Sequence, residues 1–516
     1  MIGRRTMLIL ANNLVGAFFG FFALRYLARF PPESVGAYTW AFSAVGVAML
    51  LATLGFHSAH VKRVSEGVEE RIANGTYFLI KLVLTTAFVF IVLGGLVFYR
   101  VVLGRTFTDA TTEPVLVIVT GAYALLSLRQ FFDATFQAHR HTARAESVLF
   151  VDTVFSVVGV AIAWNLYSRS REGWTLHDGF FDTLLDMFGI TEPLTKHDGG
   201  LLIASAYLLG RGASLVYATA TFFFHRYPLG KFSWEVFHSY KYLGLPLAFV
   251  SGLTVFYANV DRLFLGYFWD EVAVANFQIP YMILTPMLFA ATAIGTLLFP
   301  TISKLDAAGH VEEMRDNIGR AERYLSMVLL PQLVLAFVFA REGINIFNAQ
   351  YLDEALTLRI LIAYVFFSVI VAPARSLLLG TGNPRYLLHL GIINVIVVVG
   401  LNLLLVPPQT LALKEEGAAV VAGVGAIVGY GYTKARAAQW TGRAFMPPGI
   451  LRQLIAAVAL GLLLWGARAS FGAEIFTRLW QLVLVAAVSV PLYLGILILL
   501  REFGRKDWDF LMDLLH

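Results

Sequence analysis

The chain has 516 residues, of which 58% are hydrophobic and 14% are charged, with a mean hydropathy of +0.71 and a formal net charge of +5. Soluble domains carry about 25% charged and 45–50% apolar residues, so this composition excludes a soluble globular protein. The sequence contains no cysteine, which excludes disulfides, thiol nucleophiles and thiolate metal sites.

Apolar runs of about 20 residues, long enough for a helix to cross a bilayer, recur along the whole chain. They lack the period-2 alternation of barrel strands, so we predict a polytopic all-α membrane protein. The first run follows Arg4 and Arg5 without a cleavage motif of small residues, and we interpret it as an uncleaved membrane helix. Fourteen helices are expected, at about 6–30, 35–58, 77–100, 114–138, 147–167, 200–224, 243–268, 273–299, 323–340, 355–379, 386–407, 417–436, 449–470 and 478–501.

The distribution of Lys and Arg predicts the orientation of these helices. More of these cations lie in the segments on the side of the membrane that holds the N-terminus than in the segments on the opposite side. We therefore expect a multi-pass protein of the plasma or inner membrane with both termini in the cytoplasm, and no nucleic-acid partner. The connection 168–199 would face outward. Its Asp178, Asp182 and Asp186 recur every four residues opposite a set of apolar residues, which predicts a short amphipathic helix at the outer surface.

Three pairs of segments resemble each other at nearly one spacing along the chain. The spacing of about 240 residues spans six predicted helices, which indicates two parallel repeats. We predict an N-lobe at 1–226, a C-lobe at 227–440, and two additional helices with a cytoplasmic tail at 441–516. Two such lobes around a central cavity are typical of transporters. The paired segments are 27–42 with 265–281, 54–63 with 297–304, and 144–159 with 385–400.

The stretch "GLPLAFVSGLTVFYANVDRLFLGYFWDEVAVANFQIPYMI" resembles the seventh and eighth helices of the polysaccharide-transporter branch of the multidrug/oligosaccharidyl-lipid/polysaccharide (MOP) superfamily, which includes Wzx-type O-antigen flippases. Asp261, Gly266 and Phe277 fit its pattern, and "FPTISKL" and "LLLGTGNPRYLLHLGIINVIVVVGLNLLLVP" also match. The segment "VPPQTLALKEEGAAVVAG" departs from the branch by a longer outer loop. The resemblance implies two lobes around a polar cavity that move a polyprenyl-linked sugar from the inner to the outer leaflet.

Charges within membrane helices are candidate functional residues, because burying them in lipid is costly. Arg211 lies near the middle of helix 200–224. It is expected either to bind the diphosphate of a lipid-linked oligosaccharide or to pair with a buried acid such as Asp152. Arg25 and Arg29 close the first helix, where they either extend to the outer interface or line an outer vestibule.

Asp261 and Arg262 interrupt the otherwise uncharged stretch 243–269. Neighbouring residues on a helix point about 100° apart, so one of the two can face the cavity while the other bonds to a neighbouring helix. A structural lock between the lobes is an equal alternative. Arg129 and Asp133 are four residues apart on one helix and are expected to pair with each other.

Together with these charges, the resemblance implies a flippase that moves a polyprenyl-diphosphate-linked oligosaccharide by alternating access, with membrane lipids as further partners and H⁺ or Na⁺ as a coupling ion. No enzyme activity, cofactor or metal site is expected. Two alternatives stay open. A lipid II flippase of the same superfamily shares fourteen helices and a cationic cavity. A multidrug/cation antiporter would use Asp152 as a lone acid and would have twelve helices.

Overall fold

The computed structural model confirms a polytopic helical protein. Eleven helices of the described part are long and apolar enough to cross a membrane. The three other predicted spans correspond to the shorter helix Phe18–Leu27, to the interrupted pair α11 and α12, and to α18. The predicted surface helix with Asp178, Asp182 and Asp186 lies outside the described residues, as does the beginning of the first span. The structure describes residues 16, 18–107, 109–139, 141–171, 194–382, 385–441, 446–447, 449–471, 478–504 and 507.

Contacts between residues divide the chain into two compact units, which are described separately below. The first unit comprises Met1–Gln278 together with Val406–Thr410, and the second comprises Ile279–Leu405 together with Leu411–His516. Helix α10 packs within the first unit, against α2 and α4. The repeat boundary at 226/227 is a sequence prediction about related segments, and it stays a prediction.

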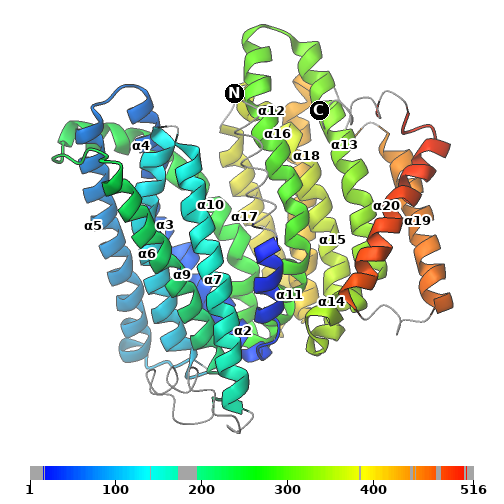
Figure 1. Ribbon diagram of the computed structural model, residues 1–516, viewed down its shortest axis with the longest axis horizontal. Coiled ribbons are helices and arrows are strands. Elements are labelled where there is room, and N and C mark those ends of the chain that lie inside the picture. The colour runs from blue at the N-terminus through cyan, green and yellow to red at the C-terminus, as the bar shows by residue number, and fades with distance from the viewer. Residues whose placement is uncertain are drawn as a thin grey trace. The chain divides into compact units, whose positions relative to one another are not determined.

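The first unit consists of helices that run side by side (Figure 1). Helix α9 packs along both α6 and α7, and α10 packs on α2. Its elements are α2 (Pro32–Ala48), α3 (Leu50–Thr53), α4 (Phe56–Ser65), α5 (Glu70–Val97), the π-helical turn η1 (Phe98–Val102), α6 (Thr112–Ala138), α7 (Thr142–Arg171), α9 (Gly199–Phe224), α10 (Trp234–Phe268) and the first residues of α11 (Glu271–Leu284).

The second predicted span of this unit is interrupted between α3 and α4. Leu54 (φ +38°) and Gly55 (φ +69°) both adopt the left-handed conformation, which an α-helix cannot contain. A side chain at Gly55 would collide with the carbonyl of Gly244 in α10, so glycine is needed both for the backbone angle and for the close approach. Irregular backbone at membrane depth is tolerated where protein covers it, and here α10 does so.

The second unit is also built from helices and the turns that join them in its described part. Helix α15 packs on α18, α12 on α16, and α13 on α19. Its elements are η2 (Thr285–Leu288), α12 (Phe289–Ala307), α13 (Val311–Val338), α14 (Ala340–Phe347), η3 (Ala349–Glu354), α15 (Ala355–Ile370), α16 (Ala372–Gly380), α17 (Arg385–Leu405), α18 (Lys414–Thr441), α19 (Ile450–Phe471) and α20 (Leu479–Leu499).

Helix bounds follow the spacing of the predicted repeat. Helices α5 and α13 both have 28 residues, and they begin at Glu70 and Val311, 241 residues apart. Helix α13 also begins well before the membrane span predicted at 323–340, because the polar segment that precedes the apolar run continues the same helix.

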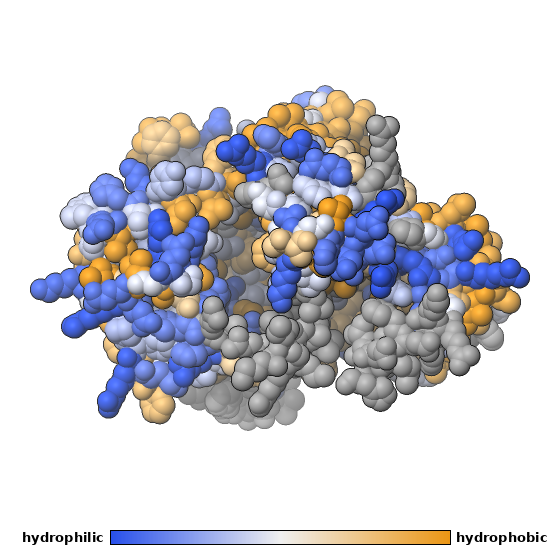
Figure 2. Space-filling model, turned by 90° about the horizontal axis from the view of Figure 1, so that it is seen from above, coloured by the Kyte–Doolittle hydropathy of each residue, from blue (hydrophilic) through white to orange (hydrophobic). Residues whose placement is uncertain are grey.

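Hydrophilic side chains cover much of the end face drawn in Figure 2, as expected for a surface outside the lipid.

A short return of the chain completes the first unit. The indole N–H of Trp269, at the end of α10, donates to the carbonyl of Val406 at 2.8 Å. Val406–Thr410 belongs to the first unit, although the residues on both sides of it belong to the second.

Candidate functional site

Four charged side chains from three helices meet inside the first unit. Arg129 and Asp133 lie on α6, Asp152 on α7 and Arg211 on α9. The Nε of Arg129 is 3.2 Å from Oδ2 of Asp133, and its Nη1 is 3.1 Å from Oδ2 of Asp152. Arg211 donates from Nη1 to that same Asp152 oxygen. We call these four residues the charge cluster.

A close approach of α7 and α9 brings the charges together. A side chain at Gly210, the residue before Arg211, would collide with Oγ of Ser156 and would lie 3.1 Å from the carbonyl oxygen of Asp152. Small residues allow helices in a membrane to pack backbone to backbone. The sequence "GRG" (210–212) therefore places the long arginine side chain directly beside the acid of the neighbouring helix.

The charge cluster is balanced, since two guanidinium groups face two carboxylates. Its side chains are largely buried, Asp152 being 7% exposed and Arg211 the most exposed at 19%. Removing one member of a buried pair leaves an uncompensated charge, which costs about 3–5 kcal/mol. Among the described residues, the second oxygen of Asp152 and that of Asp133 accept no hydrogen bond from the protein, so both carboxylates retain acceptor capacity.

Arg211 also borders a small aromatic cavity within the first unit. Tyr38, Tyr123 and Tyr207 form part of its wall, and the rings of Tyr38 and Tyr207 stack at 5.1 Å. The cavity holds about 10 Å³, which is room for roughly one water molecule. This cavity is therefore too small for a sugar, and Arg211 is the cation that lines it.

The expected partner of Arg211 is present, because the guanidinium bonds Asp152. A role of Arg211 toward substrate stays a prediction.

Arg25 and Arg29 are half-buried near the end of the helix Phe18–Leu27. The guanidinium of Arg29 lies over the ring of Tyr26, 5.5 Å from its centre, an arrangement that stabilises a cation at an interface.

Asp261 and Arg262 are both buried, each with 6% of its surface exposed. Arg262 donates from Nε to the side-chain oxygen of Gln278 at 2.5 Å, and its guanidinium lies 5.4 Å from the ring centre of Phe277. Because Gln278 and Phe277 both lie on α11, these contacts of Arg262 connect α10 to α11. This is the bond to a neighbouring helix that the sequence led us to expect for one of the two residues.

Sequence reasoning missed three buried charges. Lys81 of α5, inside the span predicted at 77–100, is 1% exposed. Glu322 of α13 pairs with Lys434 of α18 through both carboxylate oxygens, at 2.8 and 2.9 Å, and both side chains are under 5% exposed. The repeat spacing could have revealed the pattern, because Glu322 lies 241 residues after Lys81.

A polar network fixes the described end of the chain to α13. Arg323 donates to the side chain of Glu502 at 2.9 Å and to that of Asp507 at 2.6 Å, and Tyr324 donates to Asp507 at 2.8 Å. Burial by itself would raise the pKa of the Asp507 carboxyl. The hydrogen bonds from Arg323, from the Gly504 N–H and from Tyr324 outweigh burial and hold that pKa below its ordinary value.

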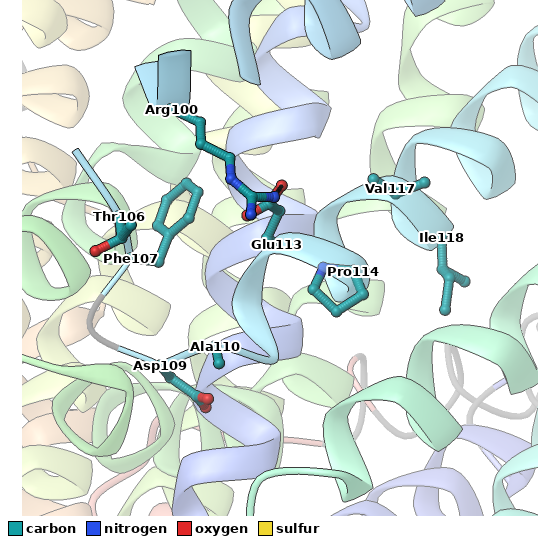
Figure 3. A pocket seen from close by; sticks show the side chains of 9 residues that line it. All are labelled: Arg100, Thr106, Phe107, Asp109, Ala110, Glu113, Pro114, Val117 and Ile118. Carbon is teal, nitrogen blue, oxygen red and sulfur yellow. Dashed lines mark hydrogen bonds and ion pairs between the residues drawn. The ribbon is translucent and has the colours of Figure 1, made fainter. Parts of the chain in front are cut away.

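A larger pocket of about 680 Å³ opens at the surface of the first unit, where the segment after η1 meets the first turn of α6. Arg100 and Glu113 point toward each other across it (Figure 3), with Nη1 of Arg100 3.1 Å from the carboxylate. Because these two charges neutralise each other, they offer little attraction to a diphosphate. Its lining residues are Arg100, Thr106, Phe107, Asp109, Ala110, Glu113, Pro114, Val117 and Ile118.

Comparisons with known proteins place these features in a family. Two family models, both described as polysaccharide biosynthesis protein, match residues 2–170 and 205–383. None of the curated proteins matches the chain by sequence.

Several solved structures share the fold. The lipid II flippase MurJ in an inward closed conformation is 13% identical, with a TM-score of 0.70, and covers 96% of this chain and 99% of its own. A multidrug resistance MATE family transporter in an inward-facing conformation is 17% identical, with a TM-score of 0.63, and covers 85% and 99%. A MOP superfamily transporter from Pyrococcus furiosus, described by the reverse polarity of its binding pocket, is 17% identical, with a TM-score of 0.56, and covers 85% of this chain and 96% of its own.

The family matches extend over parts of both predicted lobes, and the shared fold extends over most of the chain. Two long segments of the chain, residues 2–170 and 205–383, therefore match families described as polysaccharide biosynthesis protein, and the chain has the fold that the MurJ and MATE structures share.

Proposed function

We propose that this protein is a flippase that moves a polyprenyl-diphosphate-linked oligosaccharide from the inner to the outer leaflet by alternating access. It would lie in the plasma or inner membrane with both termini in the cytoplasm. The observation that carries the proposal is Arg211, a cation in the middle of a membrane helix, 19% exposed and bonded to an acid that a second arginine also holds.

This arrangement suits the transient binding of a diphosphate. The planar fork of an arginine side chain matches two phosphate oxygens. If Arg211 turns to the substrate, Asp152 keeps its contact with Arg129 at 3.1 Å, so no carboxylate is left without a cation. Exchange of partners then avoids the penalty of a buried, unpaired charge, and Arg211 can return to Asp152 when the substrate leaves.

The other predicted site residues have supporting roles in this proposal. Arg25 and Arg29 would line the outer vestibule, where they meet the diphosphate after it has crossed. Asp261 and Arg262 would mark the wall of the cavity formed by α10 and α11, with Arg262 held by Gln278. The opening and closing of two lobes would expose these residues to each side in turn.

Transport of lipid II is the second candidate. The MurJ structure aligns with 96% of this chain, whereas the MATE structure aligns with 85%. A diphosphate also links lipid II to its carrier, so the same arginine chemistry would serve. The description of both family models as polysaccharide biosynthesis protein favours the first candidate.

The proposal is tested in cells depleted of the protein, by mass spectrometry of polyprenyl-diphosphate sugars in lipid extracts. We expect one completed oligosaccharide to accumulate on its carrier while the corresponding surface polymer is lost. Wild-type protein supplied from a plasmid should reverse both effects. Accumulation of the peptidoglycan precursor would instead favour lipid II. Unchanged lipid-linked sugars combined with reduced dye efflux would refute both flippase candidates and favour an antiporter.

A further inference from the structure

Lys81 of α5 is a buried cation held by uncharged groups. Its ammonium nitrogen donates to the side-chain oxygen of Gln130 at 2.8 Å, to the carbonyl of Ala52 at 3.0 Å and to the hydroxyl of Ser127 at 3.3 Å. The residue is 1% exposed. Among the described residues no carboxylate forms an ion pair with it, in contrast to the arginines of the charge cluster.

The three contacts match the protonated side chain. An ammonium group has three N–H donors and no acceptor, and three oxygen acceptors surround this one. A neutral amine has only two N–H donors and a lone pair, so it cannot satisfy all three. Dipoles alone compensate a buried charge less fully than a carboxylate does. The charge of Lys81 therefore depends on keeping every one of these acceptors in place.

One of the acceptors belongs to the interrupted helix. Ala52 lies in α3, in the last turn before the break at Leu54 and Gly55. The last carbonyls of a helix have no partner within it, and a cation near such a C-terminus is stabilised by the helix dipole. In discontinuous membrane helices these ends bind coupling cations. The ammonium of Lys81 occupies such a position.

Several titratable groups on the helices that pack against α5 have other partners. His57 of α4 is bonded to Gln137, His60 of α4 is bonded to Tyr240 of α10, and Arg129 of α6 is paired with Asp133. Lys62 and Arg63 of α4 are both paired with Glu66, and Glu113 of α6 is paired with Arg100. A change in the position of α3 would move the Ala52 carbonyl away from the ammonium of Lys81, because Ala52 is the one of its three acceptors that lies next to the break.

We propose that Lys81 is a proton-binding site that couples the bend between α3 and α4 to the proton gradient. In the bent state the ammonium holds the Ala52 carbonyl. When the bend changes, this acceptor is withdrawn, the ammonium releases one proton to water and becomes a neutral amine, and it recovers a proton when the bend returns. This inference names the coupling ion of the proposed flippase and rests on that function only for its link to transport.

The first test needs no substrate. Because the chain has no cysteine, two spin labels can be placed on exposed positions of the purified protein in nanodiscs, at Lys62→Cys on α4 and Leu103→Cys after η1. We expect the distance between the labels to change with pH in one titration. Lys81→Met should abolish the change. Gln130→Leu removes the nearest acceptor, destabilises the ammonium, and should move the midpoint by about one unit toward lower pH.

Thr85→Val is the matched control, because the Thr85 hydroxyl bonds Ser127 at 2.6 Å and is not one of the three acceptors of Lys81. It should leave the midpoint unchanged. A distance that does not depend on pH in protein with Lys81, or a full pH response in the Lys81→Met variant, would overturn the inference. Gln130→Leu keeps the test decisive if Lys81→Met does not fold, since an unshifted midpoint in that variant would also contradict it.

The second test measures transport in everted vesicles that contain either the wild-type or the variant protein. The substrate is the lipid-linked oligosaccharide that accumulates when cells are depleted of the protein. The membrane potential is clamped by potassium and valinomycin. An imposed pH gradient should change the initial rate of translocation about tenfold in wild-type vesicles and less than about twofold with Lys81→Met. Translocation that ignores the gradient in wild-type vesicles would refute proton coupling and leave the flippase proposal standing. Absence of any translocation would refute the flippase proposal, while the label distances still decide the role of Lys81.

Discussion

Lys81 and Glu322 occupy the same position in two helices of equal length. Each is the twelfth residue of a 28-residue helix, α5 beginning at Glu70 and α13 at Val311. Both side chains are buried. Glu322 is compensated by the opposite charge of Lys434, whereas Lys81 is compensated by three uncharged acceptors. The two units thus bury a charge at the same turn and stabilise it by different means.

Substitution of Arg211 tests the partner exchange proposed for transport. Arg211→Ala should lower transport on the order of tenfold, the effect of losing one charge-assisted hydrogen bond of ~1.5–3 kcal/mol. Arg211→Lys retains the charge but not the fork, and should keep more activity than alanine. Accumulated lipid-linked glycan in complemented cells measures the effect. Equal transport by wild-type and alanine variants, at equal protein levels in the membrane, would exclude the role.

The pair of Glu322 and Lys434 should show strong coupling in a double-mutant cycle. Glu322→Gln and Lys434→Met should each lower the free energy of unfolding by about 3–5 kcal/mol. The first substitution leaves the buried Lys434 without an anion, and the second leaves the buried Glu322 without a cation. The double variant should lose clearly less than the sum. Unfolding in mixed micelles gives the three differences.

The exposed pair of Asp316 and Arg320 on the same helix is the control, with side chains over 60% exposed and a 3.9 Å separation. Its coupling should be below about 0.5 kcal/mol. Additive effects at Glu322 and Lys434 would contradict an intimate buried pair.

Asp507 should make the attachment of the chain end depend on pH. Its pKa is lowered in the folded protein, so its contribution to stability is present above the unfolded value of about 3.9 and is lost as pH falls through the lowered folded value. The protection of the Gly504 amide, which donates to Asp507 at 2.9 Å, is its exchange rate relative to the intrinsic rate at the same pH, and this protection should therefore fall below about pH 4.

Asp507→Asn is the control for this titration. It should exchange faster than wild type already at pH 7, and the difference between the two proteins should shrink as pH falls. A constant difference between pH 7 and about pH 3 would show that Asp507 does not hold the segment through its charge.

Gly55 and Gly67 separate two costs of adding a side chain. Both have positive φ, +69° and +94°, but a side chain at Gly55 would collide with Gly244, whereas nothing lies within 4 Å of the corresponding position at Gly67. Gly67→Ala should cost only backbone strain of about 1 kcal/mol. Gly55→Ala should lower the thermal midpoint considerably more. Equal decreases in stability for the two variants would mean that α10 moves away from Gly55 at little cost.

The fold class and most helix positions were predictable, because the length and composition of apolar runs decide where a chain can cross lipid. The pairing of Arg129 with Asp133 was predictable for the same local reason, since four residues make one helical turn. The convergence of α6, α7 and α9 on Asp152 was not, because three long-range contacts decide it. Arg211 and Asp152 were connected only as one of two alternatives.

Lys81 escaped notice for a different physical reason. Its acceptors are a backbone carbonyl, a hydroxyl and an amide, which have no charge pattern that a sequence displays. The break that exposes the Ala52 carbonyl depends on a positive φ at Leu54, a residue that gives no local sign of such a conformation.

The hydrogen bond from Trp269 to Val406 also bears on how the protein is made. The two residues are 137 positions apart, and ribosomes add about 5–20 residues per second. The indole of Trp269 therefore reaches the membrane on the order of ten seconds before its acceptor has been synthesised. Tryptophan is stable at the lipid headgroups in that interval, where water and headgroups can accept its N–H. The first unit thus passes through a stage in which the nascent chain is inserted and largely assembled, yet closes only when the ribosome has passed residue 410.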